Sequence, residues 1–388
     1  MPSQVTNYKC PACTGPLHFV GTSGKLECDY CGSKYDVAEI EALYAEKDAQ
    51  AAKAQEAADQ KREEAKEKAA ASGEGWDTTS AGGEWGAEAD GMRSYSCPSC
   101  GAELICDETT AATSCPYCGN PTVVPGQFGG TKRPDYVLPF KLDKKAAVAA
   151  LKEHYKGKIL LPRAFTAENH VEEIKGVYVP FWLFDAQADA SIRYEATRSH
   201  SHMEGDYRVT NTEHYDVYRS GTIDFERVPV DGSSKMPDDY MDSIEPFNYE
   251  ELKDFSTAYL PGFLADKYDV DANAASPRAD ERCEHSAEQS VRNTVVGYES
   301  VIAVSKNINL NRGQVKYALM PVWMLSTKWK DKTYLFAMNG QTGKIVGDLP
   351  VDKGKLRKWF WGLGLGLSVI FSLLFSGPLG RMIMGFLS

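Results

Sequence analysis

This chain of 388 residues has no excess of positive charge. It carries 43 lysine and arginine residues against 54 aspartate and glutamate residues, so its formal net charge is −11. That balance gives no general attraction to phosphate backbones, and nucleic-acid binding would need a local basic patch. The N-terminus also lacks a basic start followed by an apolar run. We therefore see no secretory signal and expect the bulk of the protein in the cytosol.

Catalytic signatures are missing as well. The chain shows no Ser/His/Asp order, phosphate loop, nucleotide fingerprint or HExxH motif. His200 and His202 alternate along an expected strand, where polar side chains facing water explain them. We assign no catalytic and no cofactor-binding residue and expect that the protein is not an enzyme. A polar pocket with converging titratable groups between Gly126 and Asp352 would reopen the enzyme alternative.

What the sequence does contain is the same four-cysteine pattern twice. Eight of its ten cysteines fall in Cys-x-x-Cys pairs, and fourteen residues separate the pairs of each set. Two such turns across a short β-hairpin aim four thiolates at one point, as tetrahedral Zn²⁺ requires. This spacing is typical of zinc ligands in a reducing compartment rather than of a disulfide scaffold. We predict two structural zinc sites, with the ligands Cys10, Cys13, Cys28, Cys31, Cys97, Cys100, Cys115 and Cys118.

The neighbours of these cysteines agree with zinc ribbons. Gly32, Gly101 and Gly119 follow the second cysteine of their turns, where the backbone can need a positive φ. Unrelated thiols and a redox pair are the alternatives, but two sets with equal gaps fit structural metal better. A closed site leaves no coordination position open for chemistry, so the ribbons indicate recognition. Residues 94–125 contain no lysine or arginine, which favours protein partners over nucleic acid.

Two segments between the ribbons differ in composition. Residues 39–71 are rich in alanine, glutamate, lysine and glutamine, so we expect a helical spacer that is solvated, with coiled-coil pairing as the alternative. Residues 72–93 are rich in glycine, serine and acidic residues and predict a flexible linker. Trp76 and Trp85 in this linker are either a short docking motif for a partner or unconstrained side chains.

Residues 126–352 predict an α+β domain. Alternating segments indicate antiparallel strands, and the stretch from Leu142 to Gly157 has a helical apolar face. Two pairs of phrases repeat in the same order: 137–146 resembles 244–253, and 178–184 resembles 319–325. We interpret them as two related halves with Trp182 and Trp323 as matching core residues; chance similarity of apolar strands is the alternative.

The C-terminal tail predicts a membrane anchor. No charged residue occurs between Trp359 and Gly380, and a helix of that length would cross a hydrocarbon core of ~30 Å. Basic residues precede the run and only Arg381 follows it, so the positive-inside rule places the large N-terminal part in the cytosol. We expect a transmembrane helix over 357–380 and a single-pass localisation at the cell membrane, with a buried core helix as the alternative. Gly362 and Gly366 could support self-association into a homo-oligomer.

From about Ser94 onward the chain resembles a bacterial family of membrane-anchored zinc-ribbon proteins of the YdjG type. The resemblance depends on the ordered set "SCPSCGAELICDETTAATSCPYCGNPTVV", "RPDYVLPFKLDKKAAVAALKEHYKGKILLP" and "IKGVYVPFWLFDA", followed by the apolar tail. Members are often labelled as containing a TFIIB-type zinc ribbon or as primosomal helicase-like. The resemblance implies a scaffold that works with SPFH/flotillin-like and phage-shock-type proteins in envelope stress.

The sequence thus predicts an α+β protein with two small zinc ribbons, a spacer, a domain of two related halves and a transmembrane helix. We expect a membrane-anchored cytosolic adaptor whose ribbons recruit protein partners, with two contact points raising the effective concentration of a multivalent partner. A membrane-tethered nucleic-acid-binding protein is the alternative. The expected units are 1–38 for the first ribbon, 39–71 for the spacer, 72–93 for the linker, 94–125 for the second ribbon, 126–352 for the domain and 357–380 for the span.

Overall fold

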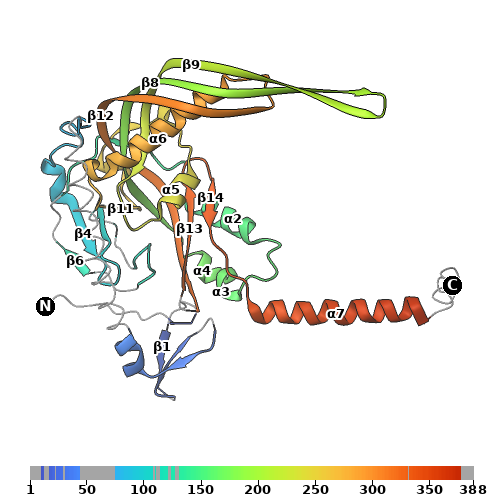
Figure 1. Ribbon diagram of the computed structural model, residues 1–388. Helices are drawn as coiled ribbons and strands as arrows, with labels where there is room; N and C mark the ends of the chain where they lie inside the picture. The colour runs from blue at the N-terminus through green and yellow to red at the C-terminus, as the bar shows by residue number, and fades with distance from the viewer. Residues whose placement is uncertain are drawn as a thin grey trace.

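The computed structural model describes residues 10–12, 17–21, 23–28, 31–43, 75–107, 110, 114–120, 124–126, 131–330 and 332–376. The fold is α+β, with one large mixed sheet and one small separate sheet (Figure 1). The small sheet has the order β1-β2-β3, formed by β1 (Leu17–Val20), β2 (Lys25–Cys28) and β3 (Lys34–Tyr35).

The large sheet has the order β10-β7-β12-β8-β11-β5-β4-β6, with β9 beside β8 and with β13 and β14 continuing from β12. Its strands are β4 (Met92–Ser96), β5 (Glu103–Asp107), β6 (Val124–Gly126), β7 (Tyr136–Val137), β8 (Lys175–Glu204), β9 (Tyr207–Asp231), β10 (Lys253–Asp254), β11 (Leu264–Asp266), β12 (Ser300–Trp329), β13 (Lys332–Asn339) and β14 (Ile345–Gly347). The helices are η1 (Ala87–Gly91), α2 (Lys144–Tyr155), α3 (Arg163–Thr166), α4 (Glu168–Val171), α5 (Asp238–Ile244), η2 (Tyr249–Glu251), η3 (Thr257–Tyr259), α6 (Ala272–Asn293) and α7 (Lys353–Ser376).

Strands β8 and β12 form the centre of the core and run antiparallel beside each other. Their side chains alternate between the two faces of the sheet, as the period of a strand requires. Val177 and Phe181 lie in a cluster with α5 and the second cysteine hairpin, whereas Tyr178 and Trp182 lie in a cluster with α6. Helix α2 packs on the later part of β12, around Trp323. Both faces are therefore covered over this region, which is why these strand segments are almost continuously apolar.

One order of elements occurs twice in the main domain. Strand β7, helix α2 and the hairpin β8–β9 correspond to β11, α6 and the hairpin β12–β13. The halves exchange their short strands, because β7 pairs in parallel with β12 and β11 pairs in parallel with β8. The indoles of Trp182 and Trp323 occupy matching positions, and each donates to a backbone carbonyl, at 2.8 and 2.9 Å.

The match of 137–146 with 244–253 is wrong. The counterpart of β7 and the start of α2 is instead β11 and the start of α6. The same six positions separate Val137 from Asp143 and Ala265 from Asp271, and each aspartate accepts from a backbone N–H of the helix that it caps. The two segments share a Pro-Phe dipeptide, and so short a match is not sufficient to identify corresponding elements.

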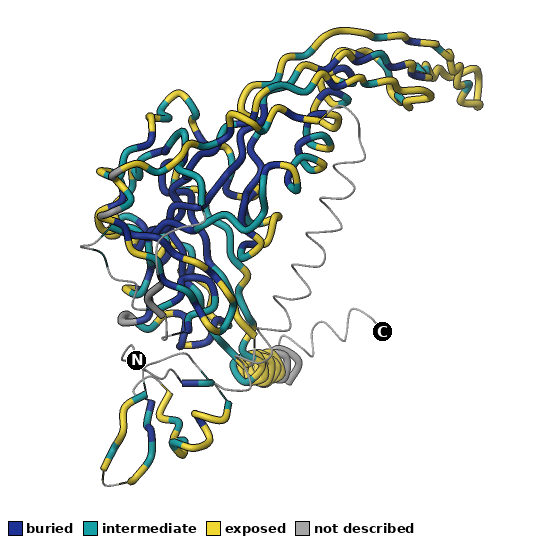
Figure 2. The backbone as a smooth tube through the Cα atoms, turned by 90° about the vertical axis from the view of Figure 1, so that its left-hand side faces the viewer, coloured by how far each residue is buried: buried dark blue, intermediate teal, exposed yellow. Residues whose placement is uncertain are grey.

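Beyond the core, β8, β9 and the first part of β12 extend as a long twisted arm (Figure 1). Helix α6 supports the base of the arm through an apolar cluster that includes Ile192, Tyr194 and Val291. Past Arg198, which lies over the rings of Tyr215 and Tyr298, the arm narrows to the β8–β9 hairpin, and most of its residues are exposed (Figure 2).

The segment expected as a flexible linker is packed against the core from Gly75 onward. Trp76 is 7% exposed, meets Phe184 edge to face and donates from its indole nitrogen to Asp280 at 3.0 Å. Trp85 meets Phe255 in the same way. The prediction of a flexible linker is wrong for these residues because the two tryptophans bury enough apolar surface to hold a glycine-rich segment in place. The docking of both tryptophans is within the chain. The spacer falls mainly on residues 44–74, which lie outside the described residues.

The prediction of a transmembrane helix over 357–380 is wrong. Among the residues that the structure describes, no helix is long and apolar enough to cross a membrane. Helix α7 begins with four basic residues among its first six, and glycines at 362, 364 and 366 lower its hydropathy. Its described charge-free part, from Trp359 to Ser376, is shorter than the ~20 apolar residues that a span needs, and residues 377–380 of the predicted span lie outside the described residues. The single-pass localisation at the cell membrane was inferred from that span, so it is overturned as well.

Candidate metal centre

The second cysteine hairpin consists of two tight turns with the same backbone geometry. After β4, the N–H of Gly101 donates to the carbonyl of Cys97 at 2.8 Å; before β6, the N–H of Gly119 donates to that of Cys115 at 3.0 Å. Both glycines have φ near +70°, a conformation that side chains with a Cβ rarely adopt. Each turn therefore bends the chain so that its two cysteines point to the same side.

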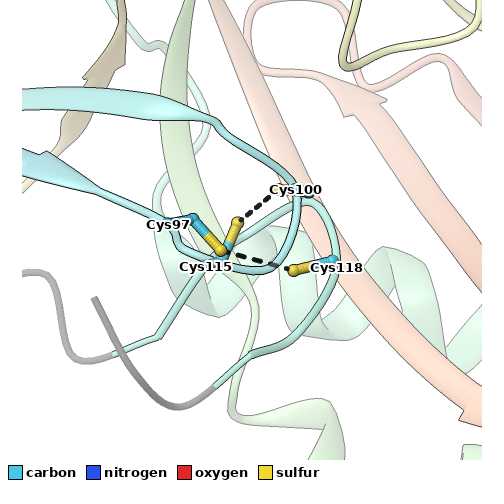
Figure 3. Close-up of side chains that lie close together, drawn as sticks. All are labelled: Cys97, Cys100, Cys115 and Cys118. Carbon is cyan, nitrogen blue, oxygen red and sulfur yellow. Dashed lines mark hydrogen bonds between the residues drawn. The ribbon is translucent and has the colours of Figure 1, made fainter. Parts of the chain in front are cut away.

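The four sulfurs of this hairpin converge on one point (Figure 3). All lie within 4.8 Å of one another, and the Sγ–Sγ distances Cys97–Cys118 and Cys100–Cys115 are both 3.6 Å. These distances are far longer than the ~2.05 Å of a disulfide. They are close to the ~3.8 Å edge of a tetrahedron of sulfurs ~2.3 Å from a central Zn²⁺. The donor set therefore fits a tetrahedral metal ion.

Hydrogen bonds among the four thiols shift their pKa values in opposite directions. Hydrogen bonds from Cys100 and Cys115 lower the pKa of both Cys97 and Cys118. Hydrogen bonding with the other thiols raises the pKa of Cys115 well above its usual value. Cys97 and Cys115 are each 1% exposed, and a buried thiolate without a counter-ion is costly. A divalent cation would favour the thiolate form at all four positions.

A buried polar junction fixes the second turn to the main sheet. The Tyr117 hydroxyl, between two of the cysteines, donates to Asp266 Oδ2 of β11 at 2.6 Å, and Ser233 Oγ donates to the same oxygen at 2.6 Å. Burial raises the pKa of Asp266 to about 7. Strand β5 also pairs with β11, so backbone and side chains hold the site at the same place. Sequence analysis missed this junction, because Asp266 is 149 residues from Tyr117 and belongs to no motif.

The first cysteine hairpin brings together Cys10, Cys28 and Cys31, whose sulfurs also lie within 4.8 Å of one another. Cys10 and Cys31 are 3.5 Å apart, and the N–H of Gly32 donates to the carbonyl of Cys28 as in the other turns. Cys13, the fourth ligand expected from the sequence, lies outside the described residues. Both hairpins are thus geometrically able to bind a metal ion.

The surroundings of the two hairpins differ. The first hairpin packs through Cys10 and Cys28 against Ala164 of α3 and Trp329 of β12, while Cys31 stays exposed. The hydroxyl of Tyr35 lies 3.6 Å from Cys10 Sγ, and burial, followed by this hydrogen bond, raises its pKa to about 12. The second hairpin belongs to the core of the large sheet, in one cluster with buried residues of both β8 and β12.

Three described lysines near the hairpins pair with carboxylates, and a fourth, Lys175 of β8, donates to the carbonyl and hydroxyl oxygens of Ser114. On the first hairpin Lys25 pairs with Asp36 at 3.3 Å and Lys34 pairs with Glu27 at 2.8 Å. On the second, Glu103 pairs with Lys267 of the main domain at 2.6 Å. Cys106 and Cys283 are both fully buried, as expected for thiols outside the metal sites.

Comparison with known proteins gives one informative relative. The protein YdjG of Bacillus subtilis (strain 168), described as uncharacterized, is 35% identical over 322 residues, an alignment that covers 70% of this chain and 94% of YdjG. No family model and no solved structure matches the chain. The identity and coverage are sufficient to assign the family: this chain belongs to the family of the bacterial protein YdjG.

Proposed function

We propose that the protein is a zinc-ribbon adaptor that binds other proteins. Its two cysteine sets would each hold a structural Zn²⁺, the second through Cys97, Cys100, Cys115 and Cys118. The single observation that carries the proposal is the tetrahedral spacing of these four sulfurs inside the core. Zinc supplies folding energy at such a site and no reacting position, because all four coordination positions are taken by the protein.

The charges support protein partners rather than nucleic acid. Backbone binding needs several lysine or arginine side chains free to meet phosphates. The described lysines of the first ribbon are paired with Asp36 and Glu27 instead, and the second ribbon has no lysine or arginine between Ser94 and Pro125. Among protein partners, the family resemblance favours SPFH/flotillin-like and phage-shock-type proteins of the envelope-stress response.

The metal part of the proposal is tested by zinc stoichiometry. Elemental analysis of the purified full-length protein should give about two zinc ions per chain, one for each cysteine set. The double variant Cys97→Ser, Cys100→Ser should lose one of them. Cys106→Ser is the matched control, since this thiol donates to the carbonyl of Thr110 and takes no part in the sulfur set. Equal zinc content in all three proteins would contradict the assignment.

The adaptor part is tested by crosslinking in cells with the full-length protein and the same double variant. Proteins captured by the wild type and by Cys106→Ser, but lost from the double variant, would support protein recruitment through the ribbon. Recovery of nucleic acid with the wild type in a salt-sensitive way would instead favour the nucleic-acid alternative.

A further inference from the structure

The outer edge of β12 is open along the arm. Between Ser300 and Arg312 the strand pairs with β8 on one side, and no described strand pairs with its other side. An unpaired edge presents a row of backbone N–H and C=O groups to any extended chain that approaches it. Ile302 and Val304 on this stretch are 65% and 52% exposed, so the edge also offers apolar side chains.

One short segment of the chain already uses the same edge further along. Asp77 forms an isolated parallel bridge with Gln314: its N–H donates to the carbonyl of Gly313 at 3.0 Å, and its carbonyl accepts from Val315 at 3.1 Å. Trp76 anchors this segment on Asp280 of α6. This edge of β12 can therefore form backbone hydrogen bonds with an extended segment. The bonds to Asp77 involve Gly313 and Val315, directly after the open stretch of β12.

A groove lies next to the middle of this open stretch. It has a volume of about 720 Å³ and is lined by Lys306, Asn307 and Ile308 of β12, by α6 between Arg278 and Glu288, and by Asp242 of α5. Ligand sites typically have volumes of about 300–1,000 Å³. A strand edge facing a helix across a groove is an arrangement that binds extended peptides as an additional strand.

The charges along the groove define the partner. Its cations are already committed: Arg278 and Arg282 both pair with Asp242, and Lys306 pairs with Glu288 at 2.9 Å. Glu281 and Glu284, in contrast, are exposed and make no salt bridge with any described residue. An incoming peptide would thus meet surplus negative charge on the helix side and a strand with only one charged residue, Lys306, between Ser300 and Asn311.

We propose that the edge of β12 from Ser300 to Arg312, together with α6, is a docking groove for an extended, lysine- or arginine-rich segment of a partner protein. The segment would add a strand to β12 and place its basic side chains near Glu281 and Glu284. The site lies on different elements from the two cysteine hairpins, so it does not depend on the proposed zinc function.

The test uses the full-length protein and a fluorescent peptide of alternating lysine and threonine. Two probes control for its two features: a peptide of alternating glutamate and threonine, and the lysine peptide with alternate backbone nitrogens methylated. Methylation keeps the charge but blocks pairing along a strand edge. In anisotropy titrations we expect the lysine peptide to bind and the glutamate peptide not to bind. The methylated lysine peptide should bind with at least about tenfold lower affinity than the unmethylated one.

Charge reversal on α6 should lower the affinity for the lysine peptide to a similar extent. The double variant Glu281→Lys, Glu284→Lys should weaken binding of the lysine peptide about tenfold or more, whereas Glu153→Lys, an equally exposed change on α2, should leave it unaltered. Equal binding of the methylated peptide, equal binding to both variants, or no binding would overturn the proposal. So would a concentration-dependent dimer in sedimentation that Ile302→Lys abolishes, because a second copy would then occupy the edge.

Discussion

The two cysteine hairpins share one spacing but have different places in the molecule. The second is part of the large sheet, through pairing of β5 with β11, and its cysteines belong to the same cluster as the central strands. The first forms its own three-stranded sheet and touches the body mainly at Ala164 and Trp329 (Figure 1). In the view of Figure 2 it lies below the main body, with few buried residues.

Residues outside the motif create this difference. Tyr95, Leu104 and Tyr117 of the second hairpin are all at most 8% exposed and pack among side chains of the main domain. In the first hairpin, by contrast, Phe19 of β1 is 60% exposed. Identical metal-ligand spacing thus sets the local turns, whereas the apolar residues between the ligands decide whether a hairpin becomes part of a core. If both bind zinc, one metal site should stabilise the whole protein and the other mainly itself.

The sharpest way to break this comparison is to remove one ligand from each hairpin. Cys115→Ser should lower the free energy of unfolding on the order of 5 kcal/mol, less than the ~10–16 kcal/mol apparent for isolated zinc peptides because the core keeps its other contacts. Cys31→Ser should change the main transition by less than about 1 kcal/mol, because its sulfur is exposed and its hairpin has a small contact with the body. Urea denaturation followed by circular dichroism measures both.

Proteolysis separates local from global effects in the same pair. Cys31→Ser should expose the first hairpin to cleavage while the rest of the chain remains resistant. Equal losses in the two variants would show that the hairpins contribute alike, and the difference in packing would then have no energetic meaning.

The buried junction under the second hairpin predicts a pH dependence. The pKa of Asp266 is raised by burial to about 7, above its value of 3.8 in an unfolded chain. The contribution of this carboxyl to stability is therefore fully present below pH 3.8 and is lost as the pH rises through about 7. Between pH 6 and 8 we expect the wild type to lose about 1.4 kcal/mol from this group, and Asp266→Asn to show a flatter profile.

Comparison of the two profiles isolates the carboxyl group. Proton competition for the cysteine ligands affects wild type and Asp266→Asn alike, so it cancels in the difference. Asp231, whose pKa burial also raises to about 7, is present in both proteins. A variant profile as steep as that of the wild type would mean that Asp266 does not titrate in this range.

A structural feature could be predicted from the sequence when the residues that form it lie close together along the chain. The turns with glycine after the second cysteine were predictable, since ligands and glycine lie within five residues. The resemblance of 178–184 to 319–325 was readable because both segments contain a Pro-x-Trp pattern, but their position on adjacent antiparallel strands was not. The contact of Tyr117 with Asp266 and the docking of Trp76 on Asp280 were not, because each joins residues far apart that carry no mutual signal.

The predictions of a transmembrane helix in the tail and of a flexible linker were wrong for a different reason. Composition gives an average over a segment, and a few side chains can override it. In residues 75–93 two tryptophans hold a glycine-rich segment against the core. In α7, basic residues occupy four of the first six positions, and three glycines lower the hydropathy of the charge-free run that follows.

The rate of zinc release compares the two hairpins with the mildest change, the loss of one hydroxyl group. With a chromogenic chelator in excess, the full-length protein should release zinc in two phases, and the fast phase should come from the first hairpin, where Cys31 is exposed. The slow phase should require opening of the core around Cys97 and Cys115, and we expect it to be at least about tenfold slower. Tyr117→Phe removes the hydrogen bond to Asp266 and should speed the slow phase several-fold without changing the fast one. Tyr30→Phe, at the same position of the first cysteine motif, is the matched control and should leave the slow phase unchanged. A single phase, or an equal response to both tyrosine variants, would mean that metal at the two sites is held equally tightly despite their different packing.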